Sequence, residues 1–243
     1  MRFSFYTLLK NIRRVFFVFM KITAKELSKY YGNKENQVTA LDKASLEIES
    51  GEFISITGPS GSGKSTLLHL LSGLDRPDSG SVLYNKQNIS ELNDRELSAF
   101  RRRKTGFIFQ QFNLLPVLTV RENIIMPVLL DKKQPDESYF SQIIELLGIS
   151  DRLTHLPNEL SGGQQQRAAI ARALIAKPDV IFADEPTGNL DSKNGNEVME
   201  MLKNISREMG KTVIVVTHNQ EIAEMADRQF VIVDGVLTEV TQR

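Results

Sequence analysis

The 243-residue sequence predicts an α/β fold with a parallel sheet and two additions, and three patterns support this class. Apolar runs of strand length alternate with helical segments between residues 53 and 216, which is typical of a parallel sheet covered by helices. Residues 21–49 alternate between apolar and polar side chains around a polar loop, which indicates an N-terminal antiparallel β subdomain. Residues from about 111 to 168 are helical in pattern and interrupted by prolines, which indicates an inserted α-helical subdomain.

The amino-acid composition bears on the possible binding partners and on the possible catalytic chemistry. The apolar fraction of 41% can form the core of one sizeable domain. The 30 basic and 30 acidic side chains cancel, so no whole-chain field attracts nucleic acid or anionic lipid, and such a partner would need a local patch. The absence of cysteine excludes disulfides, thiol catalysis and zinc–thiolate sites, and the reducing cytoplasm is the expected compartment.

Residues 1–20 form a basic and apolar extension before the domain at residues 21–243. The apolar run Val15–Met20 is far shorter than the ~20 residues that span a bilayer. No small-residue cleavage pattern follows it, which disfavours a signal peptide. Two interpretations stay open: a basic amphipathic segment on a membrane surface, or an upstream extension before a start at Met20, which we slightly favour.

Tyr31 ends the first alternating run, just before the polar loop at residues 32–36. An aromatic face beside a nucleotide site can stack on adenine. A tyrosine at this position can also simply cover the edge of the sheet, and that interpretation is favoured when the residue is taken alone.

The stretch Phe53–Thr66 reads FISITGPSGSGKST and predicts a phosphate-binding loop between a strand and a helix. Its glycines let the backbone curl so that successive N–H groups converge on phosphate oxygens. The dipole of the following helix favours an anion there, Lys64 adds a positive charge for the β- and γ-phosphates, and the Ser65 hydroxyl can ligate Mg²⁺. The loop residues expected to bind a nucleoside triphosphate are Gly58, Pro59, Ser60, Gly61, Ser62, Gly63, Lys64, Ser65 and Thr66.

The next part of the chain predicts a short strand at 81–84, a helix at 94–104 and a strand at 106–109 that delivers Gln110 at its end. The basic run at residues 101–104 suits a helix C-terminus. In the stretch that follows, the prolines are expected to separate helices; they are Pro116, Pro127, Pro135 and Pro157.

Polar motifs also flank the later predicted helices and strands. Ser161 is expected to cap a helix that runs to about residue 176, while the two glycines after it leave first-turn N–H groups accessible to an anion. A buried-type strand at 180–183 ends in Asp184 and Glu185, where one carboxylate can reach Mg²⁺ and the other, pointing the opposite way, can act on water. A helix at about 194–209 and a strand at 212–216 precede His218.

These motifs, in this order and at this spacing, closely resemble those of the ATP-binding subunits of ABC transporters over about residues 21–240. The resemblance implies a P-loop NTPase (RecA-like) core that binds and hydrolyses Mg·ATP. It also implies a homodimer in which each site pairs the phosphate loop of one subunit with Ser161–Gln164 of the other. Closure of this dimer would drive a separate integral membrane permease, so the subunit is expected as a peripheral protein at the cytoplasmic face of the plasma membrane.

The resemblance also assigns roles to individual residues. Glu185 is expected to be the catalytic base, His218 the γ-phosphate sensor and Gln110 a contact of Mg²⁺ and the attacking water. The remaining expected contacts are Tyr31 with adenine, Ser161, Gly162, Gly163 and Gln164 with the γ-phosphate held by the second subunit, Asp191 across the subunit boundary, and Ser65, Gln110 and Asp184 with Mg²⁺. Without the resemblance, His218 would pass for a surface histidine and Asp191 for a helix cap.

Within the family, ADEPTGNLD at 183–191 and FNLLP at 112–116 resemble the branch of lipoprotein-release, macrolide-export and bacitracin-resistance systems. FRRRK at 100–104, HLPNEL at 155–160 and THN at 217–219 are closer to the antimicrobial-peptide resistance type. Export of, or resistance to, antimicrobial peptides is therefore the expected role. A lipoprotein-release or cell-division ATPase is the alternative.

Other functional classes fit the pattern less well. DNA-repair relatives insert a long coiled coil before the Ser161-type motif, whereas residues 111–159 are broken by prolines and lack sustained heptads, so no nucleic-acid partner is expected. An ordinary ATP-dependent kinase would not require the helix that begins after Ser161. The apolar run at 112–117 predicts a groove near residues 111–123 that receives a cytoplasmic helix of the permease, although some of these side chains can pack inside the helical subdomain instead.

Overall fold

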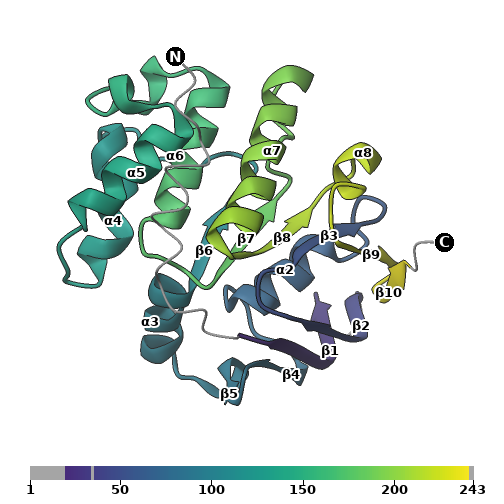
Figure 1. Cartoon of the computed structure of the whole chain (residues 1–243). Helices are drawn as coiled ribbons and strands as arrows, with labels where there is room; N and C mark the ends of the chain where they lie inside the picture. Colours follow the sequence, from purple (N-terminus) through teal and green to yellow (C-terminus); the bar gives the residue numbers. More distant parts are fainter. Residues whose placement is uncertain (1–19, 34–35, 241–243) are drawn as a thin grey trace.

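The computed structural model describes residues 20–33 and 36–240. These residues form a six-stranded sheet, a separate four-stranded sheet and the helices that pack on them (Figure 1). The predicted α/β class is therefore confirmed. Of the extension predicted at residues 1–20, only Met20 lies within the described residues.

The larger sheet contains five parallel strands and one antiparallel edge strand. In spatial order the strands are β10 (Val236–Val240), β9 (Arg228–Val233), β3 (Phe53–Thr57), β8 (Thr212–Val216), β7 (Val180–Asp184) and β6 (Thr105–Ile108). Every residue of β8 is buried, as expected for a parallel strand with helices on both faces. The carboxyl ends of β3, β6, β7 and β8 meet at one edge of the sheet. At this edge Asp184 ends β7, Gln110 follows β6 and His218 follows β8.

Alternate residues of the parallel strands face two separate hydrophobic cores. In β8, Val213 and Val215 belong to the first core, whereas Ile214 and Val216 belong to the second. The longer helices of the first core are α4 (Val120–Leu130), α5 (Glu137–Leu147), α6 (Gly162–Leu174) and α7 (Ser192–Met209), and those of the second are α2 (Lys64–Ser72) and α3 (Asp94–Lys104). Figure 1 shows α4, α5 and α6 gathered at one end of the molecule and the smaller sheet at the other.

The smaller sheet confirms the antiparallel strands predicted at residues 21–49. Its order is β2 (Val38–Ile48), β1 (Ile22–Tyr31), β4 (Ser79–Tyr84) and β5 (Gln87–Asn88), with all neighbours antiparallel. Ile22 and Ile48 of this sheet share the second core with Leu67 of α2 and Ile214 of the larger sheet. Helix α2, which follows the phosphate loop, is therefore packed between the two sheets.

Capping side chains set several helix ends. Helix α3 has the predicted bounds because Asn93 and Glu96 form a reciprocal capping box at its start. Helix α7 begins two residues before its predicted start, since Asp191 caps it. The remaining short helices are η1 (Ile89–Glu91), η2 (Ser150–Arg152), η3 (Pro157–Glu159) and α8 (Gln220–Ala223). Within residues 20–33 and 36–240, no helix combines the length and apolarity that crossing a membrane requires.

One predicted helix boundary is wrong, because Pro127 lies inside α4 instead of ending a helix. Proline has no N–H, so the carbonyl four residues earlier loses its helical partner. The helix nevertheless buries Val120, Ile124 and Ile125 in the first core, and this packing outweighs the local cost. The helix ends less than one turn after the proline.

Candidate functional site

The phosphate loop joins β3 to α2 and uses glycine for two different reasons. Gly58, Gly61 and Gly63 have φ angles of 143°, 76° and 105°, which non-glycine residues rarely adopt. A side chain at Gly58 or Gly63 would also collide with a backbone carbonyl, of Ile232 or Ala40 respectively, whereas Gly61 faces open space. The loop shape therefore depends on packing against neighbouring strands as well as on backbone freedom.

The N-terminus of α2 and two buried side chains make this loop a site for an anion. The helix begins directly after Gly63, and no side chain caps its first N–H groups. The buried Lys64 ammonium donates to the carbonyl oxygens of Gly58 and Pro59, at 2.9 and 2.7 Å. The hydroxyl of Ser62 is buried without any hydrogen-bond partner. Phosphate oxygens would accept from all of these donors.

Ser65 and Asp184 meet beside the loop. The Ser65 hydroxyl, in the first turn of α2, donates to Asp184 Oδ1 at the end of β7, at 3.0 Å. Mg²⁺ is usually held by one or two protein carboxylates together with hydroxyl, water and substrate phosphate oxygens. The pair therefore offers a donor set that fits Mg²⁺.

Glu185 is held differently from its neighbour Asp184. Its φ of 46° is in the left-handed region, and its N–H donates to the Val216 carbonyl at 3.0 Å. A bulky residue in this region costs roughly 1–2 kcal/mol, and such strain is concentrated at functional sites. The carboxylate Oε2 lies 2.9 Å from His218 Nδ1, and the His218 side chain is 72% exposed. The two adjacent carboxylates thus have separate partners, and their predicted roles with Mg²⁺ and water stay predictions.

Gln110 lies next to the segment that follows Glu185. Its carbonyl accepts a hydrogen bond from the Asn189 side chain at 2.7 Å. Its side chain lies against Gly188, where an added Cβ would stand 2.8 Å from Gln110 Nε2. Asn189 was not among the predicted site residues, although it stands in the motif at 183–191.

Ser161–Gln164 lies at the start of α6. Ser161 caps the helix as predicted: its hydroxyl accepts from Gln164 N–H at 3.4 Å, while the Gln164 side chain accepts from Ser161 N–H at 2.9 Å. Gly163 is buried against Asn194, since an added Cβ would stand 2.9 Å from Asn194 Oδ1. Gly162 lies near Leu190 and Phe112. This motif therefore packs on the segment after Gly188.

Asp191 forms the N-cap of α7. It accepts from the Asn194 N–H at 2.9 Å and from the Asn194 side-chain amide at 2.6 Å. These two hydrogen bonds hold the pKa of Asp191 below its usual value. The structure thus shows the helix-cap role, and the contact across a subunit boundary stays a prediction.

Tyr31 is brought to the end of the phosphate loop. Its hydroxyl donates to Asp75 Oδ2 at 3.0 Å and lies near Thr66. Partial burial raises the pKa of this hydroxyl. Tyr31 as a whole remains 43% exposed, and Lys29 Nζ lies over its ring at 5.4 Å from the centroid.

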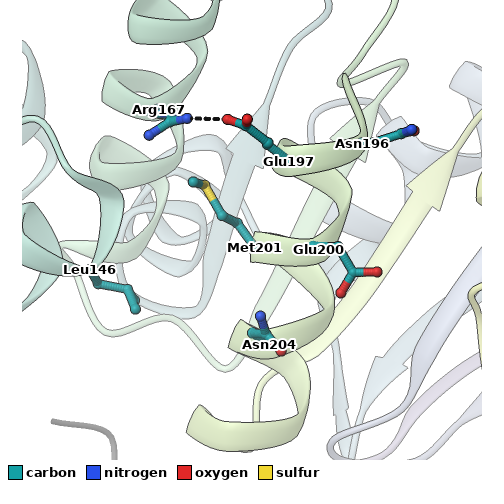
Figure 2. A pocket seen from close by; sticks show the side chains of 7 residues that line it. All are labelled: Leu146, Arg167, Asn196, Glu197, Glu200, Met201 and Asn204. Atoms are coloured by element: carbon teal, nitrogen blue, oxygen red, sulfur yellow. Dashed lines mark hydrogen bonds and ion pairs between the residues drawn. The ribbon is translucent and has the colours of Figure 1, made fainter. Parts of the chain in front are cut away.

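A hollow on α7 lies apart from these residues. It lies between α7, the C-terminal end of α5 and the middle of α6, and Figure 2 shows the ion pair of Arg167 and Glu197, 2.6 Å apart, on its rim. Its lining consists of Leu146, Arg167, Asn196, Glu197, Glu200, Met201 and Asn204. None of the predicted site residues lines this hollow.

A protein-family model described as "ABC transporter" matches residues 41–188, which is more than half of the chain. The matched range contains the phosphate loop, Ser161–Gln164 and the pair Asp184–Glu185. The chain belongs to the ABC transporter family. This ABC subunit is an ATPase, as the resemblance implied.

Three curated relatives illustrate the range of similar proteins. An ABC transporter ATP-binding protein of Methanocaldococcus jannaschii, MJ1508, is 48% identical over 226 residues, covering 91% of this chain and 100% of that protein. The lipoprotein-releasing system ATP-binding protein LolD of Cytophaga hutchinsonii is 44% identical, covering 89% and 98%. The macrolide export ATP-binding/permease protein MacB of Chlorobaculum tepidum is 46% identical, but the match covers 88% of this chain and only 33% of MacB. LolD and MacB match the lipoprotein-release and macrolide-export part of the predicted branch.

Two solved structures have the same fold. The ABC transporter cassette MJ0796, described as a dimer, has a TM-score of 0.83 and 44% identity, covering 91% of this chain and 99% of that one. A second dimeric structure of MJ0796, a post-hydrolysis state bound to ADP and phosphate, also has a TM-score of 0.83, with 43% identity. The fold of this ABC subunit is therefore that of a P-loop ABC cassette.

Proposed function

We propose that this ABC subunit acts as a homodimer that binds two Mg·ATP molecules between its copies and drives a separate integral membrane permease. The observation that supports this proposal is that the residues predicted to bind ATP fall into two groups. Lys64, Ser65 and Asp184 gather at the phosphate loop, whereas Ser161 is exposed at the start of α6, where Gly162 and Gly163 pack with the segment after Gly188. In a head-to-tail dimer, Ser161–Gln164 of each copy completes the ATP site of the other. The dimers described for MJ0796 support this arrangement.

Within one copy, the loop residues bind and orient the triphosphate. The free N–H groups of the loop and of α2 donate to phosphate oxygens, and Lys64 exchanges one of its carbonyl partners for a phosphate oxygen. Ser65 and Asp184 hold Mg²⁺, and Gln110 is its third proposed ligand. When bound, Mg²⁺ supplies positive charge that neutralises the phosphate oxygens. The partly exposed Tyr31 covers the adenine with its ring.

Glu185 is the proposed general base for hydrolysis. His218 engages Oε2 and fixes the carboxylate, which leaves Oε1 to accept a proton from water. The oxygen of that water attacks the γ-phosphorus, and the bond from this phosphorus to the bridging oxygen breaks, with the electron pair leaving on ADP. The exposed imidazole of His218 then contacts the γ-phosphate. Asp191, at the cap of α7, is the proposed contact with the second copy.

The proposed contact with the permease is the turn between Gln110 and α4. Val117 is 81% exposed and Leu115 is 44% exposed, although both are apolar. The fully buried Asn123 holds this turn, because its side chain bonds to the backbone of Leu115, Leu118 and Thr119 at 2.7–3.1 Å. A rigid apolar turn of this kind suits a short cytoplasmic helix of a permease. The subunit would then sit as a peripheral protein at the cytoplasmic face of the plasma membrane.

Antimicrobial-peptide export or resistance is the substrate role that we propose from the motifs at 100–104, 155–160 and 217–219. Lipoprotein release is the second candidate, because the LolD relative matches over nearly its whole length. Macrolide export is the role in the name of the MacB relative, but the match covers only one third of the length of MacB. Identification of the membrane protein that co-purifies with this subunit would decide between these substrates, and failure to recover any permease would contradict the proposal.

A subunit-mixing experiment tests the head-to-tail arrangement. Mixed dimers, isolated through a tag on one copy in the Glu185→Gln background, carry Lys64→Ala on one copy and Gly162→Glu on the other. This mixture places both defects in one site and leaves the second site intact, so one ATP should be retained per dimer. The matched control carries both changes on one copy, which damages both sites, and it should retain no ATP. Equal retention by the two mixtures would exclude the shared site.

A nucleic-acid-associated ATPase remains the competing class, and no nucleic-acid partner is proposed. Stimulation of ATP hydrolysis by single- or double-stranded DNA at physiological salt would favour that class over transport. We expect neither binding nor stimulation, because the chain carries 30 basic and 30 acidic side chains.

A further inference from the structure

The backbone after Gln110 turns through two consecutive left-handed residues. Phe112 and Asn113 have φ angles of 59° and 49°. Asparagine tolerates this region, but phenylalanine rarely adopts it without outside support. The local hydrogen bonds of the turn, from Phe112 N–H to Phe109 O and from Asn113 N–H to Gln111 O, leave the carbonyls of residues 112 and 113 for another partner.

That partner is Arg172, on the last turns of α6. One guanidinium nitrogen donates to Phe112 O at 2.7 Å, and the other donates to Asn113 O. Burial lowers the pKa of Arg172, which agrees with a partly buried guanidinium paired with neutral carbonyls. The planar fork of arginine suits two acceptors at once, which a single ammonium cannot match.

Gln110 is therefore held from both sides. The Asn189 side chain binds its carbonyl at 2.7 Å, and Arg172 fixes the turn two and three residues later. The exposed Gln110 side chain passes close to Gly188, where an added Cβ would stand 2.8 Å from its Nε2. The other arginine of α6, Arg167, points elsewhere, to Leu147 O at 3.3 Å and to Glu197 at 2.6 Å (Figure 2).

We propose that Arg172 is a positioning residue for ATP hydrolysis, which fixes the left-handed turn at Phe112–Asn113 and thereby sets the place of Gln110 relative to α6. The proposal rests on the role of Gln110 given under the proposed function. Ser161 caps the start of α6, the helix that is proposed to contact the second copy. The two hydrogen bonds of Arg172 therefore also link the turn after Gln110 to that helix. Arg172 itself touches neither ATP nor water in this scheme.

The test compares Arg172→Met and Arg172→Lys with Arg167→Met on the same helix, and it uses Gln110→Ala as the reference for a lost ligand. For Arg172→Met we expect kcat to fall by roughly 10-fold or more, the scale of a misplaced catalytic contact, with the Kd for ATP within about 2-fold of wild type. Arg172→Lys should recover part of kcat, since it reaches one carbonyl at a time. Arg167→Met should keep the wild-type kcat.

Amide hydrogen exchange supplies a readout that does not depend on activity. Exchange should rise in residues 110–114 of Arg172→Met while the rest of α6 keeps wild-type protection. Unchanged exchange in 110–114, faster exchange there with wild-type kcat, or a general loss of protection across α4, α5 and α6 would each overturn the inference. If Arg172→Met does not fold, the same exchange and kcat measurements on Arg172→Lys decide the question. Wild-type turnover by Gln110→Ala would refute the proposed role of Gln110, while the exchange data would still judge the Arg172 link.

Discussion

The hydroxyl of Ser65 donates to Asp184 Oδ1 at 3.0 Å, across a sequence separation of 119 residues. This bond joins the first turn of the phosphate-loop helix to the end of β7, next to the edge strand β6 of the larger sheet. It brings a hydroxyl and a carboxylate to the place where a phosphate-bound Mg²⁺ needs oxygen ligands. Glu185, one residue later, turns to His218 instead. The first prediction follows from the different partners of these two adjacent carboxylates.

Glu185→Gln should bind ATP but hydrolyse it at least ~100-fold more slowly, because it removes the proposed general base while keeping the shape of the side chain. The ATP-bound variant should accumulate as a dimer. Phosphate release and size-exclusion chromatography with ATP measure both effects. Turnover near the wild-type rate would show that another group accepts the proton.

Lys64→Ala should lose ATP binding while the fold survives, since Lys64 is the side-chain cation of the phosphate loop. A nucleotide titration with parallel circular dichroism tests this. Lys25→Ala, at an exposed position on β1, is the matched control and should bind ATP normally. Unchanged affinity in Lys64→Ala would mean that the loop binds no triphosphate.

Val117→Asp should abolish co-purification with the membrane partner and leave the ATP affinity of the isolated subunit unchanged. The structure favours this change over charge reversal at Arg121 or Glu122. Arg121 pairs with Glu137 at 2.7 Å, and Glu122 completes the capping box of α4, so their loss would also disturb the helix. Val236→Asp, on the edge strand β10, is a control at another exposed valine. Retained co-purification after Val117→Asp would place the permease contact elsewhere.

A chain beginning at Met20 should fold and bind ATP like the longer chain. Met20 is buried in the second core with Ile22, and the recognised motifs follow it in the sequence. Thermal melting and ATP titration of the two chains test this. If the shorter chain lost binding to anionic liposomes, residues 1–19 would act as the amphipathic anchor.

The ion cluster around Asp131 should make stability depend on pH. Hydrogen bonds from Lys133 and Arg103 hold the pKa of Asp131 below its ordinary value. A lowered folded-state pKa stabilises the fold above the unfolded-state pKa of about 4, and this contribution disappears as pH falls through the folded value. Asp131→Asn should therefore lower Tm at pH 7, and the difference from wild type should shrink toward pH 3. A difference that is independent of pH would exclude an ionic origin.

Several features follow from the sequence because they depend on residues within one turn or one strand. The phosphate loop, the Ser161 cap, the bounds of α3 and β8, and the antiparallel start of the chain are of this kind. Family membership follows too, since the order and spacing of the motifs are properties of the chain itself. The catalytic roles of individual residues stay predictions.

Only the tertiary structure decided which distant residues meet. The position of Tyr31 near Thr66, the carbonyls of Ile232 and Ala40 that require Gly58 and Gly63, and the fork of Arg172 depend on strand order and helix placement. The prediction for Pro127 was wrong for the same reason. Proline tends to break a helix locally, but burial of one face of α4 in the first core outweighs that tendency. Local patterns are read within a few residues, whereas these contacts arise from packing across the whole domain.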